Sequence, residues 1–309
     1  MFKQLRYLLA VSTVALVAAC GGSDDDHPSN IVETAAADPR FSILVEAVGA
    51  AGLAETLSGP GPFTVFAPTN DAFAALLGEL GLTKEQLLAD KPLLGAVLTY
   101  HVVAAEVARS AVPLGEAITT VQGGIFKVDA VGSDLVITDG RNRTSKVTAT
   151  DLEARNGVIH VIDKVLLPAD KNIVQTAQSL PDFSILVEAV EAANLQGALS
   201  AAGPLTVFAP TNAAFASLLA ELGVSKEALL ANTALLTQVL TYHVVDGRVL
   251  KADVPVGPTI TTLQGETFSV DSTLAITDRR IRKAAIVATD VLASNGVIHV
   301  IDKVILPAP

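Results

Sequence analysis

Four of the five histidines stand at repeated positions and are the side chains best suited to chemistry: His101, His160, His243 and His299. A neutral imidazole can bind a metal ion or act as a general base. A zinc site needs three or four His, Cys, Asp or Glu ligands. Near His160 the nearest carboxylate in sequence, Asp163, falls on the opposite face of a strand, and no thiol is close. We therefore expect neither a metal site nor a cofactor.

A nucleophilic serine is the second kind of chemistry to consider. Ser42 and Ser184 lie in apolar segments with helical spacing, where a hydroxyl is poorly placed to attack a substrate. The sequence contains no Gly-x-Ser-x-Gly motif, which in hydrolases forms the sharp turn that exposes the nucleophile. The residues therefore favour a protein that is not an enzyme.

Two clusters of basic residues offer a binding function instead. Each cluster lies in one predicted hairpin loop of an otherwise acidic chain. Arginine can bind carboxylates or sulfates with two parallel hydrogen bonds, so an anionic polysaccharide is one candidate partner. The alternative is a solvated turn between strands. The clusters are Arg141, Arg143 and Lys146, and Arg279, Arg280, Arg282 and Lys283.

The elements that position these residues occur twice. Phe-Ser-Ile-Leu-Val-Glu-Ala-Val at residues 41–48 returns at 183–190, and Asn-Gly-Val-Ile-His-Val-Ile-Asp-Lys-Val at 156–165 returns at 295–304. The spacing falls from 142 to 139 residues between Gln264 and Ile276, which we interpret as a shortened hairpin loop. A period of this length matches a whole domain. We predict domains at residues 29–168 and 169–309.

Each copy changes its pattern halfway along. Residues 43–48 and 73–80 have helical spacing, and Thr83 with Gln86 forms a capping box before an apolar run. Asn232 is predicted to cap a helix in the second copy, and residues 64–66 a short buried strand. Strands are predicted at 100–103, 118–122, 125–129, 135–139, 147–151 and 157–166, joined as antiparallel hairpins. The fold class is α+β, an antiparallel β-sandwich or wedge flanked by helices.

These motifs resemble the fasciclin-like (FAS1) domain. The first signature, Phe-Thr-Val-Phe-Ala-Pro-Thr-Asn-Asp-Ala-Phe, stands at 63–73 and, with two changes, at 205–215. The Asn-Gly-x-Ile-His-x-Ile-Asp motif follows at 156–163 and 295–302, and a Tyr-His pair lies between the signatures in each copy. The resemblance covers nearly all of residues 29–309. It implies two tandem seven-stranded β-wedges and a role in extracellular adhesion to proteins or carbohydrates.

The Tyr-His pairs, Tyr100-His101 and Tyr242-His243, allow two interpretations. By resemblance to the family, this region contacts cell-surface receptors. Alternatively, His101 joins strand to helix through groups such as Thr69 or Asn70, because a buried polar group without a partner costs roughly 1–3 kcal/mol. The two interpretations predict different effects of an alanine at His101: lost binding for the first, and lost stability for the second.

The N-terminus predicts export and a lipid anchor. Lys3 and Arg6 precede an apolar run at residues 7–19, which is shorter than the roughly 20 residues that span a bilayer. The run ends in Leu-Val-Ala-Ala before Cys20, which resembles the lipobox of bacterial lipoproteins, where the cysteine thiol is acylated. Cys20 is the only cysteine. We expect a signal peptide at 1–19 and a lipidated tether at 20–28; the alternative is an ordinary signal peptide.

Composition and charge limit the function further. Half of the 309 residues are hydrophobic and the formal net charge is -11. Loss of the leader would remove two basic residues and lower it to -13. Such a chain repels nucleic acid. We expect a lipid-anchored protein of the bacterial envelope that binds a cell-surface or matrix protein or polysaccharide. The alternative is a carrier of an apolar lipid or pigment.

Overall fold

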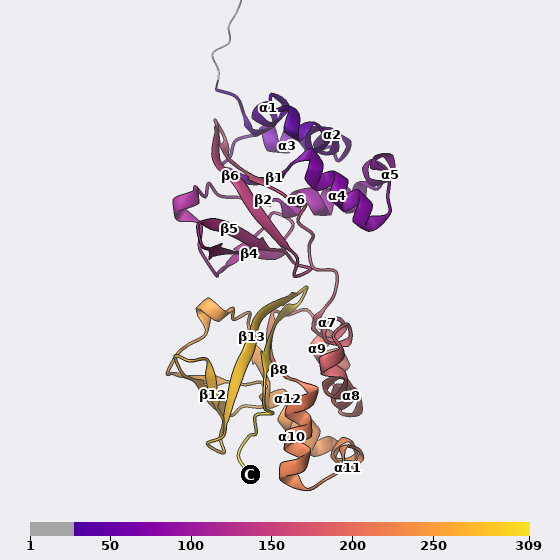
Figure 1. Cartoon of the computed structure of the whole chain (residues 1–309), viewed down its shortest axis with the longest axis vertical. Helices are drawn as coiled ribbons and strands as arrows, with labels where there is room; N and C mark the ends of the chain where they lie inside the picture. Colours follow the sequence, from indigo (N-terminus) through magenta and orange to yellow (C-terminus); the bar gives the residue numbers. More distant parts are fainter. Residues whose placement is uncertain (1–27) are drawn as a thin grey trace, which may run out of the picture.

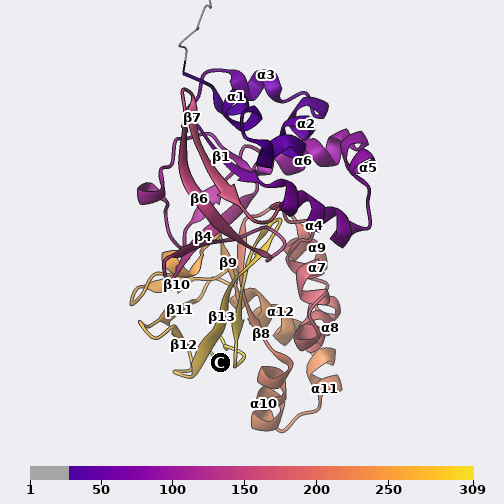
Figure 2. The ribbon, with the colours of Figure 1, turned by 45° about the horizontal axis from the view of Figure 1, so that its top comes forward.

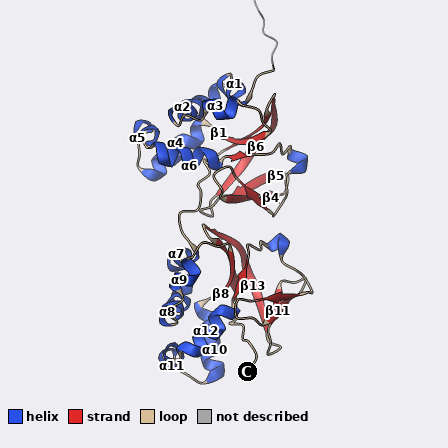
Figure 3. Ribbon diagram, turned by 180° about the vertical axis from the view of Figure 1, so that it is seen from behind, coloured by secondary structure: helices blue, strands red, loops and turns tan. Residues whose placement is uncertain are grey.

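The structure, a computed structural model, describes residues 28–309. The predicted leader and Cys20 lie outside the described residues. Two modules follow one another along the long axis of the molecule (Figure 1). In each, the α-helices gather on one side and the strands on the other, and one short helix lies on the strand side (Figure 3). The α+β class and the two tandem wedge-like modules are thereby confirmed.

The first module contains a seven-stranded sheet with the order β2-β1-β7-β6-β5-β4-β3. Neighbouring strands are antiparallel except β1 and β7, which pair in parallel. The strands are β1 (Phe63–Pro68), β2 (Val102–Val103), β3 (Ala117–Thr119), β4 (Ile125–Val131), β5 (Asp134–Thr138), β6 (Thr144–Ala154) and β7 (Gly157–Ile162). The parallel pair joins the strands of the two sequence signatures, so these signatures form two neighbouring interior strands of the sheet.

Short capped helices cover one face of this sheet. The capping box of Thr83 and Gln86 is present as predicted, and a second box at Asn30 and Glu33 starts the first helix. The helices are α1 (Ile31–Ala36), η1 (Pro39–Phe41), α2 (Ser42–Ala50), α3 (Ala54–Ser58), α4 (Asn70–Leu80), α5 (Lys84–Ala89), α6 (Lys91–Tyr100) and η2 (Arg109–Ala111). One apolar core lies between helices and sheet, and a second, around Phe66, Tyr100 and Phe126, lies inside the curled sheet.

The second module repeats this order, and Asn232 caps α12 as predicted. Its strands are β8 (Leu205–Pro210), β9 (Val244–Asp246), β10 (Thr259–Thr261), β11 (Thr267–Val270), β12 (Ala275–Thr277), β13 (Lys283–Ala293) and β14 (Gly296–Ile301). Its helices are α7 (Ile173–Gln178), η3 (Pro181–Phe183), α8 (Ser184–Ala192), α9 (Gln196–Ser200), α10 (Asn212–Leu222), α11 (Lys226–Ala231), α12 (Thr233–Tyr242) and η4 (Lys251–Asp253). From a second direction α7, α8, α10 and α11 of this module again lie on one side, and β10 to β13 on the other (Figure 2).

Several details differ from the sequence-based prediction: the strand predicted at 157–166 ends at Ile162, and the one predicted at 118–122 ends at Thr119. The predicted strand at 100–103 is wrong at its start, because Tyr100 is the last residue of α6 and only Val102–Val103 is extended. The three-residue deletion also does not shorten a loop. The β4–β5 hairpin pairs out to Val131 and Asp134, whereas β11 and β12 are shorter and are joined by a longer turn that the Asp271 carboxylate caps. The deletion therefore removes the projecting tip of the hairpin.

Candidate functional site

The two Tyr-His pairs lie inside the modules. His101 is 1% exposed; its Nδ1 lies 2.7 Å from the Val97 carbonyl oxygen and its Nε2 accepts the Leu166 N–H at 2.8 Å. The ring therefore carries its proton on Nδ1 and satisfies a carbonyl at the end of α6 that the helix leaves without a partner. Burial lowers the pKa of His101 to about 4, so the ring is neutral at physiological pH. His243 makes the same two contacts in the second module.

The tyrosines are equally enclosed. Tyr100 and Tyr242 are fully buried, and their hydroxyls donate to the carbonyl oxygens of Ile125 and Thr267. The partners proposed for the histidine from the sequence, Thr69 and Asn70, serve elsewhere, since Thr69 caps α4 and Asn70 binds the Pro39 carbonyl and the Ile43 N–H. Tyr100, His101, Tyr242 and His243 are thus connecting groups of the fold, and their side chains are not presented to a partner in this structure.

The second histidine of each copy is also part of the fold. His160 Nε2 donates to the Val107 carbonyl oxygen at 2.8 Å, and its Nδ1 accepts the Asp151 N–H at 3.3 Å. Asp151, with φ of 58°, accepts the Arg109 N–H in turn. Within residues 28–309 no three His, Cys, Asp or Glu side chains are grouped as metal ligands.

The signature asparagine organises the other end of each module. The Asn156 amide accepts the Ile31 N–H and donates to the carbonyl oxygens of Leu57 and Gly59, so it joins α1, α3 and β7. Asn295 makes the equivalent bonds in the second copy. The glycine that follows, Gly157, has φ of 150°, and a Cβ there would lie 1.9 Å from a carbonyl oxygen of β1. The repeated polar motif is therefore required by the packing.

The basic clusters form ordered turns around a buried aspartate. Asp139 accepts the N–H groups of Arg141, Arg143 and Leu167, and Asp278 repeats this arrangement in the second module. Burial raises the pKa of Asp139, in spite of these bonds. The Arg143 guanidinium contacts Glu79 and the Val165 carbonyl oxygen. Most of the predicted basic charge is thus neutralised within the protein.

The remaining arginines of the clusters have different surroundings. Arg282 contacts Glu221 much as Arg143 contacts Glu79. Arg280 donates from Nε to the Pro307 carbonyl oxygen at 2.9 Å, and Arg279 is half exposed, 3.6 Å from Glu266. Arg141 is 32% exposed and forms an ion pair with Asp170 at 3.2 Å, at the junction of the two modules. Arg141 is therefore the cluster residue that lies between modules.

The short link at residues 167–171 predicts that the two domains touch, but the residues that form their junction were not predicted from the sequence. Lys127 of β4 binds Asp290 of β13 at 2.8 Å, and the Asp290 side chain is only 2% exposed. Burial alone disfavours the Lys127 ammonium, but Asp290 and Asp129 outweigh it and raise its pKa. The Asn142 amide donates to the Leu292 carbonyl oxygen and accepts the Leu292 N–H, like a strand partner.

An apolar contact completes the junction. Ile125 of the first module packs against Leu250, Leu292 and Val297 of the second, and these four side chains are buried. Gly115 also faces the second module, because a Cβ at this position would lie 3.5 Å from the Ala252 Cβ. The useful signal in the sequence is the difference between the two copies: the counterpart of Asn142 is Ile281, which is 86% exposed.

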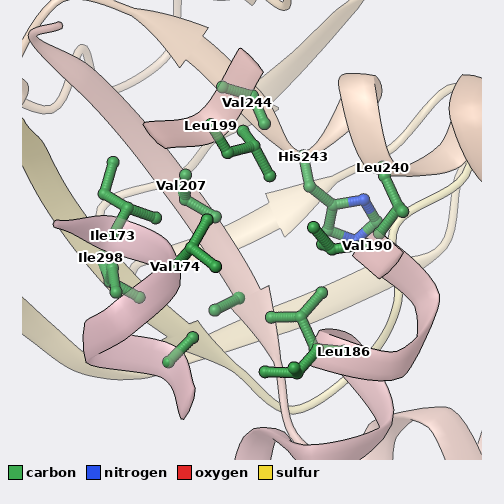
Figure 4. Close-up of a pocket in the computed structure, with 13 residues that line it drawn as sticks. Ile173, Val174, Leu186, Val190, Leu199, Val207, Leu240, His243, Val244 and Ile298 are labelled. Carbon is green, nitrogen blue, oxygen red and sulfur yellow. The ribbon is translucent and has the colours of Figure 1, made fainter. Parts of the chain in front are cut away.

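Each module also has a small apolar cavity between its helices and its sheet. In the second module it lies beside His243 and between α7, α8 and β8 (Figure 4). Both cavities measure about 30 Å³. Sites for small organic molecules occupy roughly 300–1,000 Å³. The predicted alternative of a lipid or pigment carrier therefore finds no support in these two cavities.

Across residues 28–309, no helix combines the length and the apolar character that a membrane span needs. The profile of the Fasciclin domain matches residues 39–168 and 181–307 of the chain. The match covers one module in each segment and most of the residues that the structure describes. It includes both copies of each signature identified in the sequence.

Several named proteins are similar in sequence to this chain. Protein sll1483 of Synechocystis sp. is 46% identical over 147 residues, which cover 46% of this chain and 76% of that protein. Human periostin is 27% identical over 288 residues, 92% of this chain and 32% of periostin. The transforming growth factor-beta-induced protein ig-h3 of Sus scrofa is 32% identical over 255 residues, 81% of this chain and 35% of that protein. The chain thus spans about a third of the two animal proteins.

One solved structure is also similar, the FAS1 domain pair from the insect cell adhesion molecule Fasciclin I. It shares 20% sequence identity, with coverage of 86% of this chain and 95% of that chain, and the TM-score is 0.44.

Proposed function

The chain belongs to the Fasciclin domain family, and from this premise we propose that it is a non-enzymatic binding protein for adhesion outside the cytoplasm. Its partners are proteins or polysaccharides of the cell surface or matrix. The observation that supports this proposal is the use of the repeated polar side chains. His101, His160, Asn156 and their counterparts hold the fold together. Recognition is therefore assigned to the outer surface and to the junction.

The tandem arrangement suits such a role. A lysine–aspartate pair, a two-bond amide contact and an apolar contact hold the modules in one orientation. Two sites at a fixed spacing on one body raise the effective concentration of the second binding event, so a modest affinity at each site is sufficient. A multivalent surface or polymer is the kind of partner that benefits from this arrangement.

We also propose that acylated Cys20 anchors the chain to the bacterial envelope. The lipobox-like Leu-Val-Ala-Ala-Cys segment supports the anchor, as does the short acidic and glycine-containing stretch before Ser29. Metabolic labelling with an alkyne fatty acid tests it. Label is expected on the wild type and not on Cys20→Ala, and equal labelling of both proteins would exclude an anchor at this residue.

The binding function is tested with the full chain solubilised in mild detergent and immobilised through a C-terminal tag. Matrix proteins, acidic polysaccharides and neutral polysaccharides are passed over it, and saturable binding is measured. Gly157→Ala, in which a new Cβ would collide with β1, is the misfolded control. We expect at least one macromolecule to bind the wild type and not the control. Turnover of a substrate that disappears with His160→Gln, without loss of folding, would overturn the proposal.

A further inference from the structure

A cleft of about 520 Å³ opens at the junction of the two modules. The turn between β5 and β6 forms one wall, and α7 with the end of β13 forms the other. The linker passes directly over Gly140, where a Cβ would lie 2.3 Å from the Ala169 nitrogen. The counterpart of Gly140 in the second module is Arg279. The cleft therefore belongs to the pair of modules and has no second copy in the described residues.

The charged groups of the cleft favour an anion. Arg141 and Lys171 line it with Asp170 as the one acidic residue among the lining side chains, so the local balance is positive in a chain of net charge -11. Among the described residues, Arg141 Nε is buried without a hydrogen-bond partner. Its counterpart Arg280 instead donates from Nε to the Pro307 carbonyl oxygen. The Arg141 guanidinium therefore has fewer partners than that of Arg280. Its ion pair with Asp170 is exposed, and a bound carboxylate can replace it.

The uncharged lining is mixed. The hydroxyl-bearing residues Thr176 and Ser179 line the cleft at the end of α7, and the Ser179 hydroxyl donates to the Thr176 carbonyl oxygen; Leu180, Val291 and Leu292 contribute an apolar surface. A pyranose ring presents the same combination, hydroxyls around its edge and C–H groups on its faces. The volume lies within the range of small-ligand sites.

We propose that this cleft binds a uronic acid unit of an acidic polysaccharide, with its carboxylate on Arg141 and Lys171. Guanidinium and carboxylate match in two parallel hydrogen bonds, which also fixes the orientation of the sugar. The proposal rests on the binding function proposed above and specifies one partner and one site for it. An extended acidic peptide satisfies the charges but lacks the combination of hydroxyls and apolar ring faces that suits the mixed lining. It is the competing ligand in the test.

Comparison with the first module supports the assignment. Lys171 takes the place of Ser29, Ser179 that of Ala37, and Leu180 that of Asp38. These changes place a cation, a hydroxyl and an apolar group in the cleft. The first module has the same fold without these groups at the equivalent positions, so the fold does not require them.

The test measures binding of trigalacturonate to the detergent-solubilised full chain by isothermal titration calorimetry. Its methyl ester and hexaglutamate are the comparison ligands. The variants are Arg141→Gln and, as the matched control, Arg280→Gln, the same change at the equivalent position outside the cleft. We expect Arg141→Gln to weaken binding about tenfold or more, which is the scale of one charged hydrogen-bonded contact. Arg280→Gln should leave it unchanged, and the methyl ester, which lacks the charge for both Arg141 and Lys171, should bind at least as weakly as the Arg141 variant binds the acid.

Several results would overturn the assignment. These are an equal loss in both variants, binding of hexaglutamate as tight as that of trigalacturonate, or no binding of trigalacturonate by the wild type. Because the Arg141–Asp170 pair is exposed, Arg141→Gln should keep the wild-type melting temperature, which separates lost binding from lost folding. Absence of trigalacturonate binding while another macromolecule still binds defeats this inference alone. Absence of every partner defeats the proposed function as well.

Discussion

Replacing His101 by alanine removes the partner of two buried backbone groups at once. The Val97 carbonyl oxygen and the Leu166 N–H both bind the ring, at 2.7 and 2.8 Å. Each would be left unsatisfied at a cost of roughly 1–3 kcal/mol, and the vacated ring volume adds to that loss. We therefore expect a destabilisation of roughly 2–6 kcal/mol. Because small domains are stable by only about 5–15 kcal/mol, the first module should be close to unfolding.

Thermal and urea unfolding followed by circular dichroism measure this loss. A destabilisation of 1 kcal/mol shifts the melting temperature of such domains by about 2–8 °C, so the transition of the first module should fall by roughly 4 °C or more. His243→Ala is the matched variant, because His243 makes the same contacts in the second module. Glu116→Ala, at an exposed residue, is the control and should melt like the wild type.

The opposite outcome is equally definite. If His101→Ala melts like the Glu116 control and loses its macromolecular partner, the ring is a recognition group. The assignment of the Tyr-His pair to the fold, drawn from the hydrogen bonds and burial of His101, would then be incorrect.

Three other substitutions or conditions test separate parts of the structure. Burial lowers the pKa of His101 and His243 to about 4 from an unfolded value near 6.5, so between pH 6.5 and 4 the unfolded chain binds more protons than the folded protein. The free energy of unfolding should therefore be highest above pH 6.5 and fall by roughly 3 kcal/mol per ring as the pH drops to 4. Urea unfolding curves that do not change between pH 7 and 4.5 would contradict this. Lys127→Met leaves a buried carboxylate of the second module without its cation, so proteolysis of the linker should accelerate; Lys146→Met, at an exposed ion pair, should not change it. Gly157→Ala places a Cβ 1.9 Å from a carbonyl oxygen of β1, so this variant should misfold. A Gly157→Ala protein that is soluble and melts cooperatively would refute the steric argument.

Much of the fold could be predicted from the sequence because the chain repeats itself. Two copies of each signature gave the number of modules, and capping residues such as Thr83 and Asn232 fixed helix starts through local hydrogen bonds. The parallel pairing of β1 and β7 could not be read in this way, because its partners are 94 positions apart at Phe63 and Gly157 and no local pattern records a long-range neighbour. Tyr100 was assigned to a strand for a related reason. Its helix ends where the His101 ring, rather than the next turn, satisfies the backbone.

The candidate site was harder to predict, because type and spacing do not show which polar groups are already satisfied. The arginines of both clusters are the residues expected at an anion site, yet Arg143 and Arg282 already form ion pairs with Glu79 and Glu221. The short link at residues 167–171 indicates that the modules touch, but the residues of the junction were not identified. Lys127 and Asp290 belong to different modules, and their pairing depends on how the modules stack.

Duplication offers a way to separate fold from function that one copy alone does not. A polar residue that both modules keep in the same contacts, as His101 and His243 do, is explained by the fold. A residue that differs at an equivalent position is free of that requirement, so its identity reflects what only one copy must do. By this criterion Asn142, which stands where the second module has exposed Ile281, serves the junction, and its two bonds to Leu292 confirm that role. The same criterion, applied to Lys171 against Ser29, points to the cleft beside it, where the next experiments on binding belong.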